Sequence, residues 1–462
     1  MTFHFELQLL SIENKKASGR FISGCFCLSG KKYSSGFLKM LTFILCLLPC
    51  VLYAQKDTTL PDGTDGMVFT PRAADTVFVD KKSDLPANEF EGKYATFRVG
   101  MGYIGDFTGY SQDAVFKQQM DSAGLDLKPN YQTRDFRILG SGRILTSKRY
   151  LAYKFAYMYD GDKKVWMMRE TGVTIGVPEL KGNFFVGRTK EGFSMIKVMN
   201  GHSGVANERS MATDPIPILA DGIKYMGYYP KSRTFLNLGY FNDFMSKGQS
   251  FSTYSSQWVV RAGWLPIYNK DNNRVLHIAG EFQYGRPLNG EMTLKSRPES
   301  NPTPQLINTG AFATNKSFQY GGEIFYRTNR FMIGSEVISH NFYSNTTTNH
   351  QFNGGDAMVS YFFTKTSRPY NTVGNIFGFV PVKKSVFNGG FGEIEGVLHV
   401  STFNLNDKDI KGGQMTRITP MVNWYLTSYL RWELIYGYGI LNRYGLKGHV
   451  NFFETRIQVT LM

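Results

Sequence analysis

The chain ends on the stretch Asn451–Met462, NFFETRIQVTLM, in which apolar and polar residues alternate. In an extended strand, one face carries Phe453, Thr455, Ile457, Val459 and Leu461. The opposite face carries Glu454, Arg456, Gln458 and Thr460. Successive side chains of a strand point to opposite sides, so this period of two predicts a strand that separates an apolar medium from water.

The same alternation recurs in many segments from about residue 93 onward. Phe97, Val99 and Met101 share a face opposite Arg98, and the segment 430–438 repeats the pattern. The apolar faces are rich in Tyr, Trp and Phe near the segment ends, where aromatic girdles meet a membrane interface. Segment lengths of about 10 to 14 residues exceed the usual 5 to 6 of soluble strands. We therefore predict an all-β fold over residues 93–462, a transmembrane antiparallel β-barrel of about 16 strands, with no helix after residue 93.

One long apolar run, Leu41–Ala54, lies outside the alternating segments. It is shorter than the roughly 20 residues of a membrane-spanning helix. Lys31, Lys32 and Lys39 precede it, and a small residue ends it, as in a secretory signal peptide. We predict a leader and cleaved signal peptide over 1–54 and a polar periplasmic segment over 55–92. An exported β-barrel of this kind is expected in the outer membrane of a Gram-negative bacterium.

Cysteine placement and motif spacing exclude several chemistries. All four cysteines (Cys25, Cys27, Cys46 and Cys50) lie in the predicted leader, so the processed chain would hold none. That excludes a disulfide scaffold and a cysteine nucleophile. The remaining histidines show no metal-ligand spacing, and no basic helix or stacking platform for nucleic acid appears. We expect no cofactor, no metal site and no nucleic-acid partner.

Two long gaps interrupt the alternation, Gly192–Gly222 and Thr366–Gly390. In β-barrels of outer membranes the long loops belong on the outer side. We therefore expect both gaps there. Either gap is a plain surface loop or a loop that folds into the lumen and narrows it, and the first gap is the better candidate for the latter.

Four stretches carry a family resemblance. Val186–Ser210 reads VGRTKEGFSMIKVMNGHSGVANERS. It is similar to the pattern Gly-x-x-Lys-Glu-Pro-Phe-Ser followed by Glu-Arg, with Gly192 in place of Pro. Ser296–Glu299, Tyr361–Tyr370 (YFFTKTSRPY) and Glu395–Trp424 match in the same order. The chain resembles the phosphate-selective porin O and P family.

The resemblance implies a homotrimer of sixteen-stranded barrels, each a water-filled channel in outer-membrane lipid. It also implies that lumen arginines lead small anions such as phosphate to a narrow basic zone. Two departures stand out. His399 occupies a position where the family commonly has Arg, and the chain ends in Met462 where an aromatic residue is usual.

Strand parity places eleven bases on the predicted lumen face: Arg98, Arg137, Arg143, Lys154, Arg188, Lys190, Arg261, Arg327, Arg417, Arg431 and Arg456. Arginine suits phosphate because its planar guanidinium can bind two oxygens at once. Arg188 and Lys190 share a face and lead into the first gap, so they are the first candidates for anion binding. Arg209 and Arg297 from the loops join them, with Arg137, Arg143, Arg417, Arg431 and Arg456 as further channel-lining candidates.

The same faces also carry acids, among them Asp135, Glu281, Glu323 and Glu433. Opposite charges on neighbouring strands attract, so many of the lumen bases are equally candidates for bracing the barrel wall. The formal net charge of +15 has two interpretations as well. It either draws anions toward the channel or reflects lysines at the rim that meet acidic headgroups.

We predict a porin for passive diffusion of small solutes, with a preference for anions or phosphate, and no enzyme. A non-conducting barrel for scaffolding or attachment is the alternative. A barrel lipase or protease is a weaker one, since Ser203 with His202 or His399 is the only nucleophile and base set that the sequence offers.

Overall fold

The computed structural model describes residues 88–245, 253–270 and 273–461. The predicted leader and signal peptide (1–54) and nearly all of the predicted periplasmic segment (55–92) lie outside the described residues. The four cysteines and Met462 lie outside them too.

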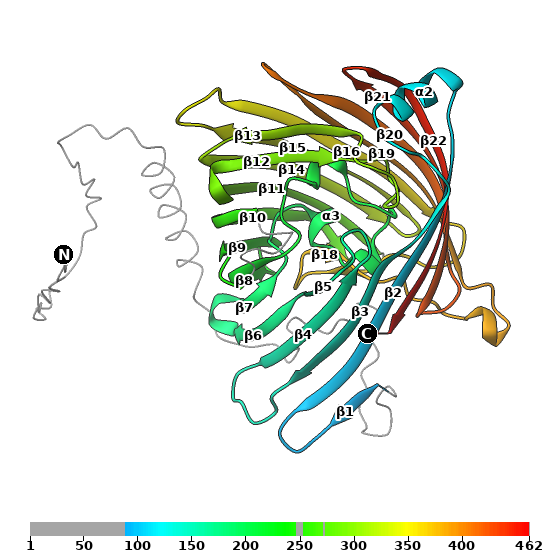
Figure 1. The fold of residues 1–462 in the computed structure, drawn as a ribbon. Helices are drawn as coiled ribbons and strands as arrows, with labels where there is room; N and C mark the ends of the chain where they lie inside the picture. The colour runs from blue at the N-terminus through cyan, green and yellow to red at the C-terminus, as the bar shows by residue number, and fades with distance from the viewer. Residues whose placement is uncertain (1–87, 246–252, 271–272, 462) are drawn as a thin grey trace, which may run out of the picture. The chain divides into compact units, whose positions relative to one another are not determined.

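Eighteen strands hydrogen bond into one antiparallel sheet that closes on itself (Figure 1). β5 and β6 both pair with β4 and form one wall strand together, and β1 (Glu89–Glu91) continues the line of β22. The wall therefore has 16 strands, which confirms the predicted fold class. The remaining bounds are β2 (Thr96–Ser111), β3 (Asn130–Arg143), β4 (Leu151–Asp160), β5 (Val165–Met168), β6 (Thr171–Val177), β7 (Gly182–Thr189), β8 (Ala220–Tyr229), β9 (Thr234–Asn242), β10 (Tyr254–Asn269), β11 (Arg274–Pro287), β14 (Lys316–Thr328), β15 (Phe331–Tyr343), β16 (His350–Phe362), β19 (Glu393–Asp407), β20 (Ile410–Tyr425), β21 (Leu430–Arg443) and β22 (Leu446–Leu461).

The barrel closes where β22 pairs with β2, in the register Met101↔Leu461 to Ser111↔Asn451. The alternation predicted for this last strand is confirmed. Phe453 is 64% exposed on the outside, whereas Glu454 and Arg456 are buried in the lumen. Closure leaves the sheet no free edge, so the wall strands satisfy their backbone hydrogen bonds among themselves, as a strand in lipid requires.

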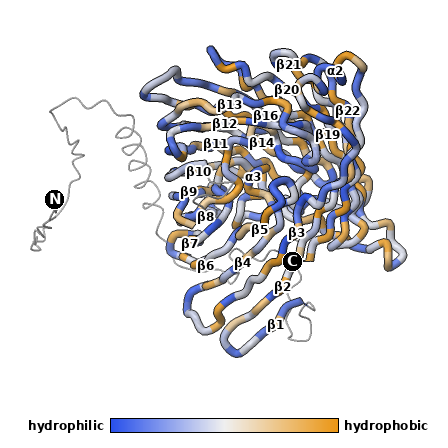
Figure 2. Tube along the Cα trace, viewed as in Figure 1, coloured by the Kyte–Doolittle hydropathy of each residue, from blue (hydrophilic) through white to orange (hydrophobic). Residues whose placement is uncertain are grey.

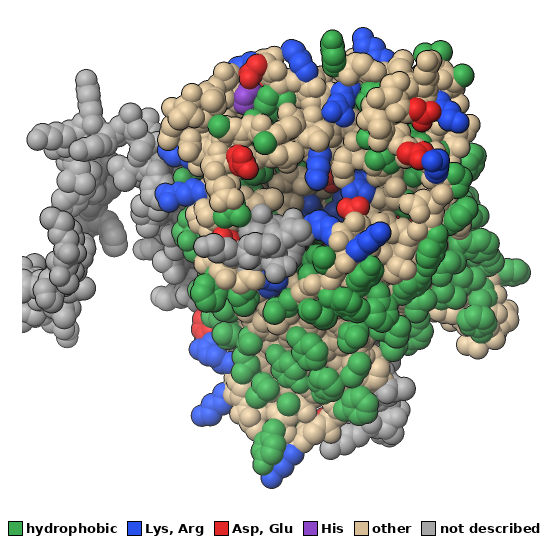
Figure 3. All heavy atoms as spheres, viewed as in Figure 1, with side chains coloured by type: hydrophobic (Ala, Val, Ile, Leu, Met, Phe, Trp, Pro, Cys, Tyr) green, Lys and Arg blue, Asp and Glu red, His purple; other side chains and the backbone are tan. Residues whose placement is uncertain are grey.

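The outer surface is apolar by the same parity. Tyr157, Ile324, Leu434 and other large hydrophobic side chains point outward and are exposed. Figure 2 shows hydrophobic and hydrophilic residues alternating along the strands, and Figure 3 shows hydrophobic side chains gathered over the outer wall while Lys and Arg surround the hollow of the mouth. Among the described residues, no helix has the length and apolar character needed to cross a membrane.

Short turns such as 230–233 and 426–429 join the strands at the end of the barrel that holds Thr96 and Leu461. One connection at this end is long, residues 363–392, which we name the end segment. It contains β17 (Tyr370–Asn371), β18 (Ile376–Phe377) and η6 (Val386–Asn388). The gap 192–222 opens from the opposite end of the barrel, between β7 and β8. The expectation that both long gaps lie on the outer side is therefore wrong for one of them.

The opposite end carries longer connections that cover part of the mouth. α2 (Ala114–Ser122) begins at Asp113, whose carboxylate accepts from the Phe116 amide at 2.8 Å. The expectation of no helix is wrong here, because two turns with Phe116 and Met120 on one face are too short to produce a clear helical period. The hairpin of β12 (Glu291–Ser296) and β13 (Ile307–Ala313), preceded by η5 (Leu288–Gly290), packs with α2 in one apolar cluster.

Candidate functional site

The loop between β7 and β8, residues 190–219, folds into the lumen, and we name it the lumen loop. It contains α3 (Met195–Val198), η3 (Gly201–Ser203) and η4 (Met211–Thr213). Phe193, Met195 and Met211 are fully buried against the inner face of the wall. Ser194 has a φ of 63°, which is uncommon for a residue with a side chain. Its hydroxyl caps α3 by accepting from the Lys197 amide at 3.1 Å.

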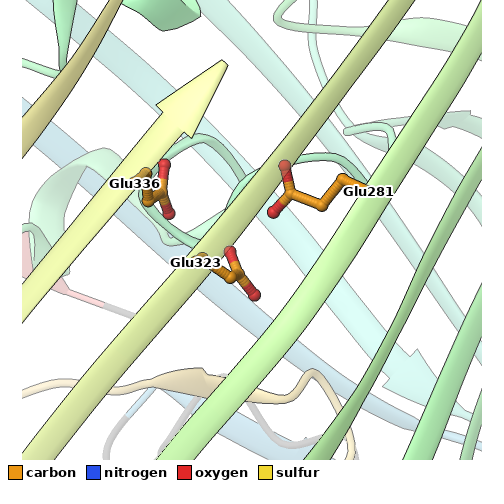
Figure 4. A group of neighbouring side chains, drawn as sticks. All are labelled: Glu281, Glu323 and Glu336. Atoms are coloured by element: carbon orange, nitrogen blue, oxygen red, sulfur yellow. The ribbon is translucent and has the colours of Figure 1, made fainter. Parts of the chain in front are cut away.

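The wall beneath α3 is acidic. Glu323, Glu336 and Asp356 lie directly opposite one another on the adjacent strands β14, β15 and β16. Like charges in such a row repel, and here they are also buried. Glu281 on β11 joins them, and one oxygen each of Glu281, Glu323 and Glu336 lies within 4.8 Å of the others (Figure 4). This row needs donors or positive charge from elsewhere in the molecule.

The lumen loop and two wall residues supply those donors. The Met195 amide donates to Glu323 at 2.7 Å, and the Ile196 amide donates to Glu336 at 3.0 Å. The Ser194 hydroxyl donates to Glu336 at 2.5 Å. Arg261 and His277 on the wall approach the other side of Glu323, each at 2.6 Å. The acidic wall is thus the docking surface of the lumen loop, and the loop covers it.

His399 continues the same arrangement farther along the wall. Its Nδ1 lies 2.6 Å from Glu299 and its Nε2 lies 3.2 Å from Asp356. The ring is fully buried. The position where the family resemblance leads one to expect a lumen arginine is therefore occupied by a residue that ties Asp356 to the connection 288–315.

The end segment enters the lumen from the other end and meets the lumen loop. Arg368 is 1% exposed, and its guanidinium donates to Glu395 at 2.9 Å and to the Tyr425 hydroxyl at 2.8 Å, both on the wall. It also donates to the carbonyl of Ser203, on the lumen loop, at 2.6 Å. Arg261 donates to the carbonyl of Asn375 at 3.1 Å. Arg368 therefore joins the end segment, the wall and the lumen loop.

The two inserted segments leave a hollow of about 240 Å³ along the wall of β2, β3, β4 and β6. We name it the basic cavity. Its bases are Arg98, Arg137, Arg143, Lys154, Arg169 and Lys190, and its acids are Glu89 and Glu170. Glu89 pairs with Arg98, Glu170 pairs with Lys154, and Asp135 beside the cavity pairs with Arg137. Positive charge exceeds negative charge on this side of the lumen.

Two of these bases lack a close carboxylate partner among the described residues. Arg143 is exposed at the end of the barrel that holds Thr96. Lys190 donates to the carbonyls of Val198, at 3.3 Å, and Met199. Burial and the neighbouring guanidinium groups of Arg209 and Arg169 hold the pKa of Lys190 well below its ordinary value. A group in that state gains from the arrival of an anion.

Comparison of the sequence with models of protein families identifies the family of this chain. The model of phosphate-selective porin O and P matches residues 97–461, almost the whole described barrel. The chain belongs to this porin family. The resemblance seen in the sequence is confirmed, and the barrel is an outer-membrane porin.

Comparisons with individual proteins support the porin fold. An uncharacterized protein of Caulobacter vibrioides is 27% identical over 133 residues, which are 29% of this chain and only 27% of that protein. Outer-membrane expressed OmpT of Vibrio cholerae aligns with a TM-score of 0.51 and 10% identity, over 80% of this chain and 99% of that one. An anion-selective porin from Comamonas acidovorans aligns with a TM-score of 0.50 and 11% identity, over 79% of this chain and 99% of that one. At such identities the solved structures speak for the fold alone.

The porin uses several of the predicted site residues as braces. Arg188 is 2% exposed and pairs with Asp221 at 2.7 Å. Arg297 pairs with Asp162 at 2.9 Å, and Arg456 pairs with Asp106 at 2.6 Å. Arg417 and Arg431 donate to backbone carbonyls of the lumen loop, at 2.6 Å and 2.9 Å. These five hold strands and loops together.

The remaining predicted residues lie toward open space. Arg137, Arg143 and Lys190 line the basic cavity. Arg209 is half-buried on the lumen loop and lines a smaller hollow with Arg134. Burial and the nearby Arg134 lower the pKa of Arg209 to about 10. The basic cavity thus brings Lys190, Arg137 and Arg143 together, whereas Arg188 and Arg297 are not among the residues that line it.

Sequence reasoning missed Arg169 and Arg368 as site residues. Arg169 lies in the break between β5 and β6, where strand parity gives no face. Arg368 belongs to the matched stretch Tyr361–Tyr370, so the signal was present, but a segment without alternation offers no way to tell where its side chains point. Both are buried in the lumen.

Proposed function

We propose that this porin conducts small solutes passively with a preference for anions, phosphate among them. The observation that carries the proposal is the charge asymmetry of the lumen. The acidic wall of β11, β14, β15 and β16 is covered by the lumen loop, whereas the wall that borders the basic cavity stays open. A solute in transit therefore meets the basic side.

The chemistry of the open side suits a passing anion. Guanidinium and ammonium groups replace part of the hydration of an oxyanion, and their number gives several weak positions instead of one tight one. Surplus positive charge within low-dielectric walls also raises the local anion concentration. Arg143, at the end of the barrel that holds Thr96, and Lys190, on the lumen loop, mark the two ends of this path.

The finer features belong to the same proposal. They are a homotrimer, a signal peptide that ends at Ala54, and a preference for phosphate over other anions; the family membership and the sequence support each of them. Channel activity needs no catalytic group, metal or cofactor, so we assign no enzymatic role.

Conductance across a planar bilayer tests the proposal. In asymmetric KCl, the purified porin should give a reversal potential of anion preference, and added phosphate should reduce the current. The double variant Arg143→Gln/Arg169→Gln should shift the reversal potential toward zero. Lys231→Gln/Lys270→Gln removes the same charge from exposed turns and should leave it unchanged. Cation preference of the unaltered porin, or equal shifts in both double variants, would refute the proposal.

The alternative of a non-conducting scaffold also has an observation in its favour. The two inserted segments meet inside the barrel, where Arg368 donates to the Ser203 carbonyl. If the reconstituted protein gives no current steps at all, while its heat-modifiable migration shows a folded barrel, the scaffold function is the correct one.

A further inference from the structure

The wall of the basic cavity carries an apolar row between two rows that each hold a base. Gly100, Leu139 and Ala156 lie side by side in register on β2, β3 and β4, and all three line the cavity. The row on one side of it is Arg98, Ser141 and Lys154, and the row on the other is Gly102, Arg137 and Met158. A bulky leucine between two small residues on the lumen face forms an apolar step between two bands that carry bases.

The end segment presents apolar side chains to the same cavity. Ile376, Phe377 and Phe379 line it from the opposite side of the hollow. Phe379 is half-buried and also borders a second, smaller hollow beside His202 and Arg368, so it stands between the two spaces. A passage for a small inorganic ion gains nothing from aromatic and aliphatic walls. Such an ion is strongly hydrated, and it either keeps its water or exchanges it for polar groups of the protein.

The bases around this apolar zone can bind a group that carries two negative charges. Lys190 lies on the lumen loop, Arg169 lies on the wall between β5 and β6, and Arg143 ends β3; all three line the cavity. Lys190 makes its hydrogen bonds to backbone carbonyls, and Arg169 has the sulfur of Met158 at 3.2 Å with Asp135 only at 3.7 Å. Neither base is saturated by a tight carboxylate contact of its own.

We propose that the basic cavity selects organic anions in which a dianionic head such as a phosphate monoester is joined to an apolar body. The head meets Lys190 and Arg169, and the body lies between the Leu139 row and Phe379. This inference rests on the proposed function, because it names the class of solute within the anion-preferring channel. It predicts that an apolar group on the anion strengthens binding.

The test compares how three anions block the chloride current of the full-length porin: inorganic phosphate, phenyl phosphate and benzoate. Burying most of a phenyl ring should make phenyl phosphate block at about a tenfold lower concentration than phosphate. Benzoate has the ring but a single charge and should block more weakly than phenyl phosphate. Equal block by benzoate and phenyl phosphate would refute the claim that the cavity selects a dianionic head.

Variants locate the effect. Leu139→Asn and Phe379→Ser should each raise the blocking concentration of phenyl phosphate several-fold and leave block by inorganic phosphate unchanged, which also shows that the channel is folded. Phe379→Leu keeps an apolar surface and should retain most of the block. Leu180→Asn, on an exposed turn outside the lumen, is the matched control.

The outcomes separate the two proposals. Anion preference with equal block by phosphate and phenyl phosphate would overturn the inference and leave the proposed function standing. Unchanged phenyl phosphate block in both Leu139→Asn and Phe379→Ser would overturn it as well. Cation preference of the unaltered porin would refute the proposed function and the inference together.

Discussion

Arg368 holds the end segment in the lumen, and its replacement by methionine should release that segment. Methionine has a similar length without charge or donors. The variant loses the contacts of the guanidinium to Glu395, to the Tyr425 hydroxyl and to the Ser203 carbonyl. It also loses the hydrogen bond to Gly378 within the segment itself, at 3.3 Å.

The magnitude follows from burial. Arg368 and Glu395 are 1% and 0% exposed at their side chains, so Glu395 would be left as a buried charge. Removing one partner of a buried ion pair costs about 3–5 kcal/mol. Glu395 keeps the Tyr425 hydroxyl at 2.8 Å and the Asn423 amide at 3.1 Å, which places the cost near the lower limit. About 3 kcal/mol corresponds to a shift of roughly 150-fold in the ratio of docked to released end segment.

Single-channel recording measures the consequence. Arg368→Met should show a larger mean conductance or frequent transitions to a higher level, because the released segment no longer fills the lumen beside Ser203. Lys384→Met, an exposed lysine of the same segment, is the matched control. A folded Arg368→Met barrel with the conductance and current noise of the unaltered protein would refute the reasoning.

Three further predictions concern the lumen loop and the pairing of β22 with β2 that closes the barrel. Sulfate keeps its charge between pH 6 and 9, and its approach should raise the depressed pKa of Lys190. Sulfate binding then takes up a proton, so block of the current by sulfate should weaken as the pH rises. The variant Lys190→Gln should show a flatter pH dependence of this block. The same pH dependence in Lys190→Gln would assign it to another group. Ser194→Ala removes the α3 cap and the hydrogen bond to Glu336, should loosen the docked loop by about 1–2 kcal/mol, and should increase open-channel noise, whereas unchanged noise would contradict that role. Arg456→Leu leaves Asp106 and Glu208 without their shared partner and should lower the free energy of unfolding by about 3–5 kcal/mol in urea titrations in detergent, with Lys447→Leu on the same strand as the control.

The wall of the barrel could be predicted from sequence because lipid and water impose the period of two on every strand. Phe97, Val99, Met101 and Ile457 all point outward as their parity requires, and Arg456 points inward. Strand number and closure follow from counting such segments. The break at β5 and β6 was less visible, since four residues and then seven are too few to fix a face.

The candidate site was predictable only in part, since parity gives a direction but no partner. Arg188 and Lys190 share a face in sequence, yet Asp221 on the adjacent strand neutralises the first, while backbone carbonyls surround the second. Asp221 becomes the neighbour of Arg188 only through the register of β7 with β8. The end at which a long connection lies depends on counting every strand before it, which is why 366–390 was placed on the wrong side.

The two halves of the lumen wall explain each other. A row of carboxylates on neighbouring strands is unfavourable alone, so its presence requires a docked group, and the amides of Met195 and Ile196 are that group. Docking there holds α3 on the acidic side. The loop also reaches β3, where Glu208 pairs with Arg134, and the basic cavity stays open beside that contact. An anion path therefore does not need a lumen that is basic throughout. It needs a loop that is attracted to the acidic half, so that the position of the loop and the charge of the passage have one common cause.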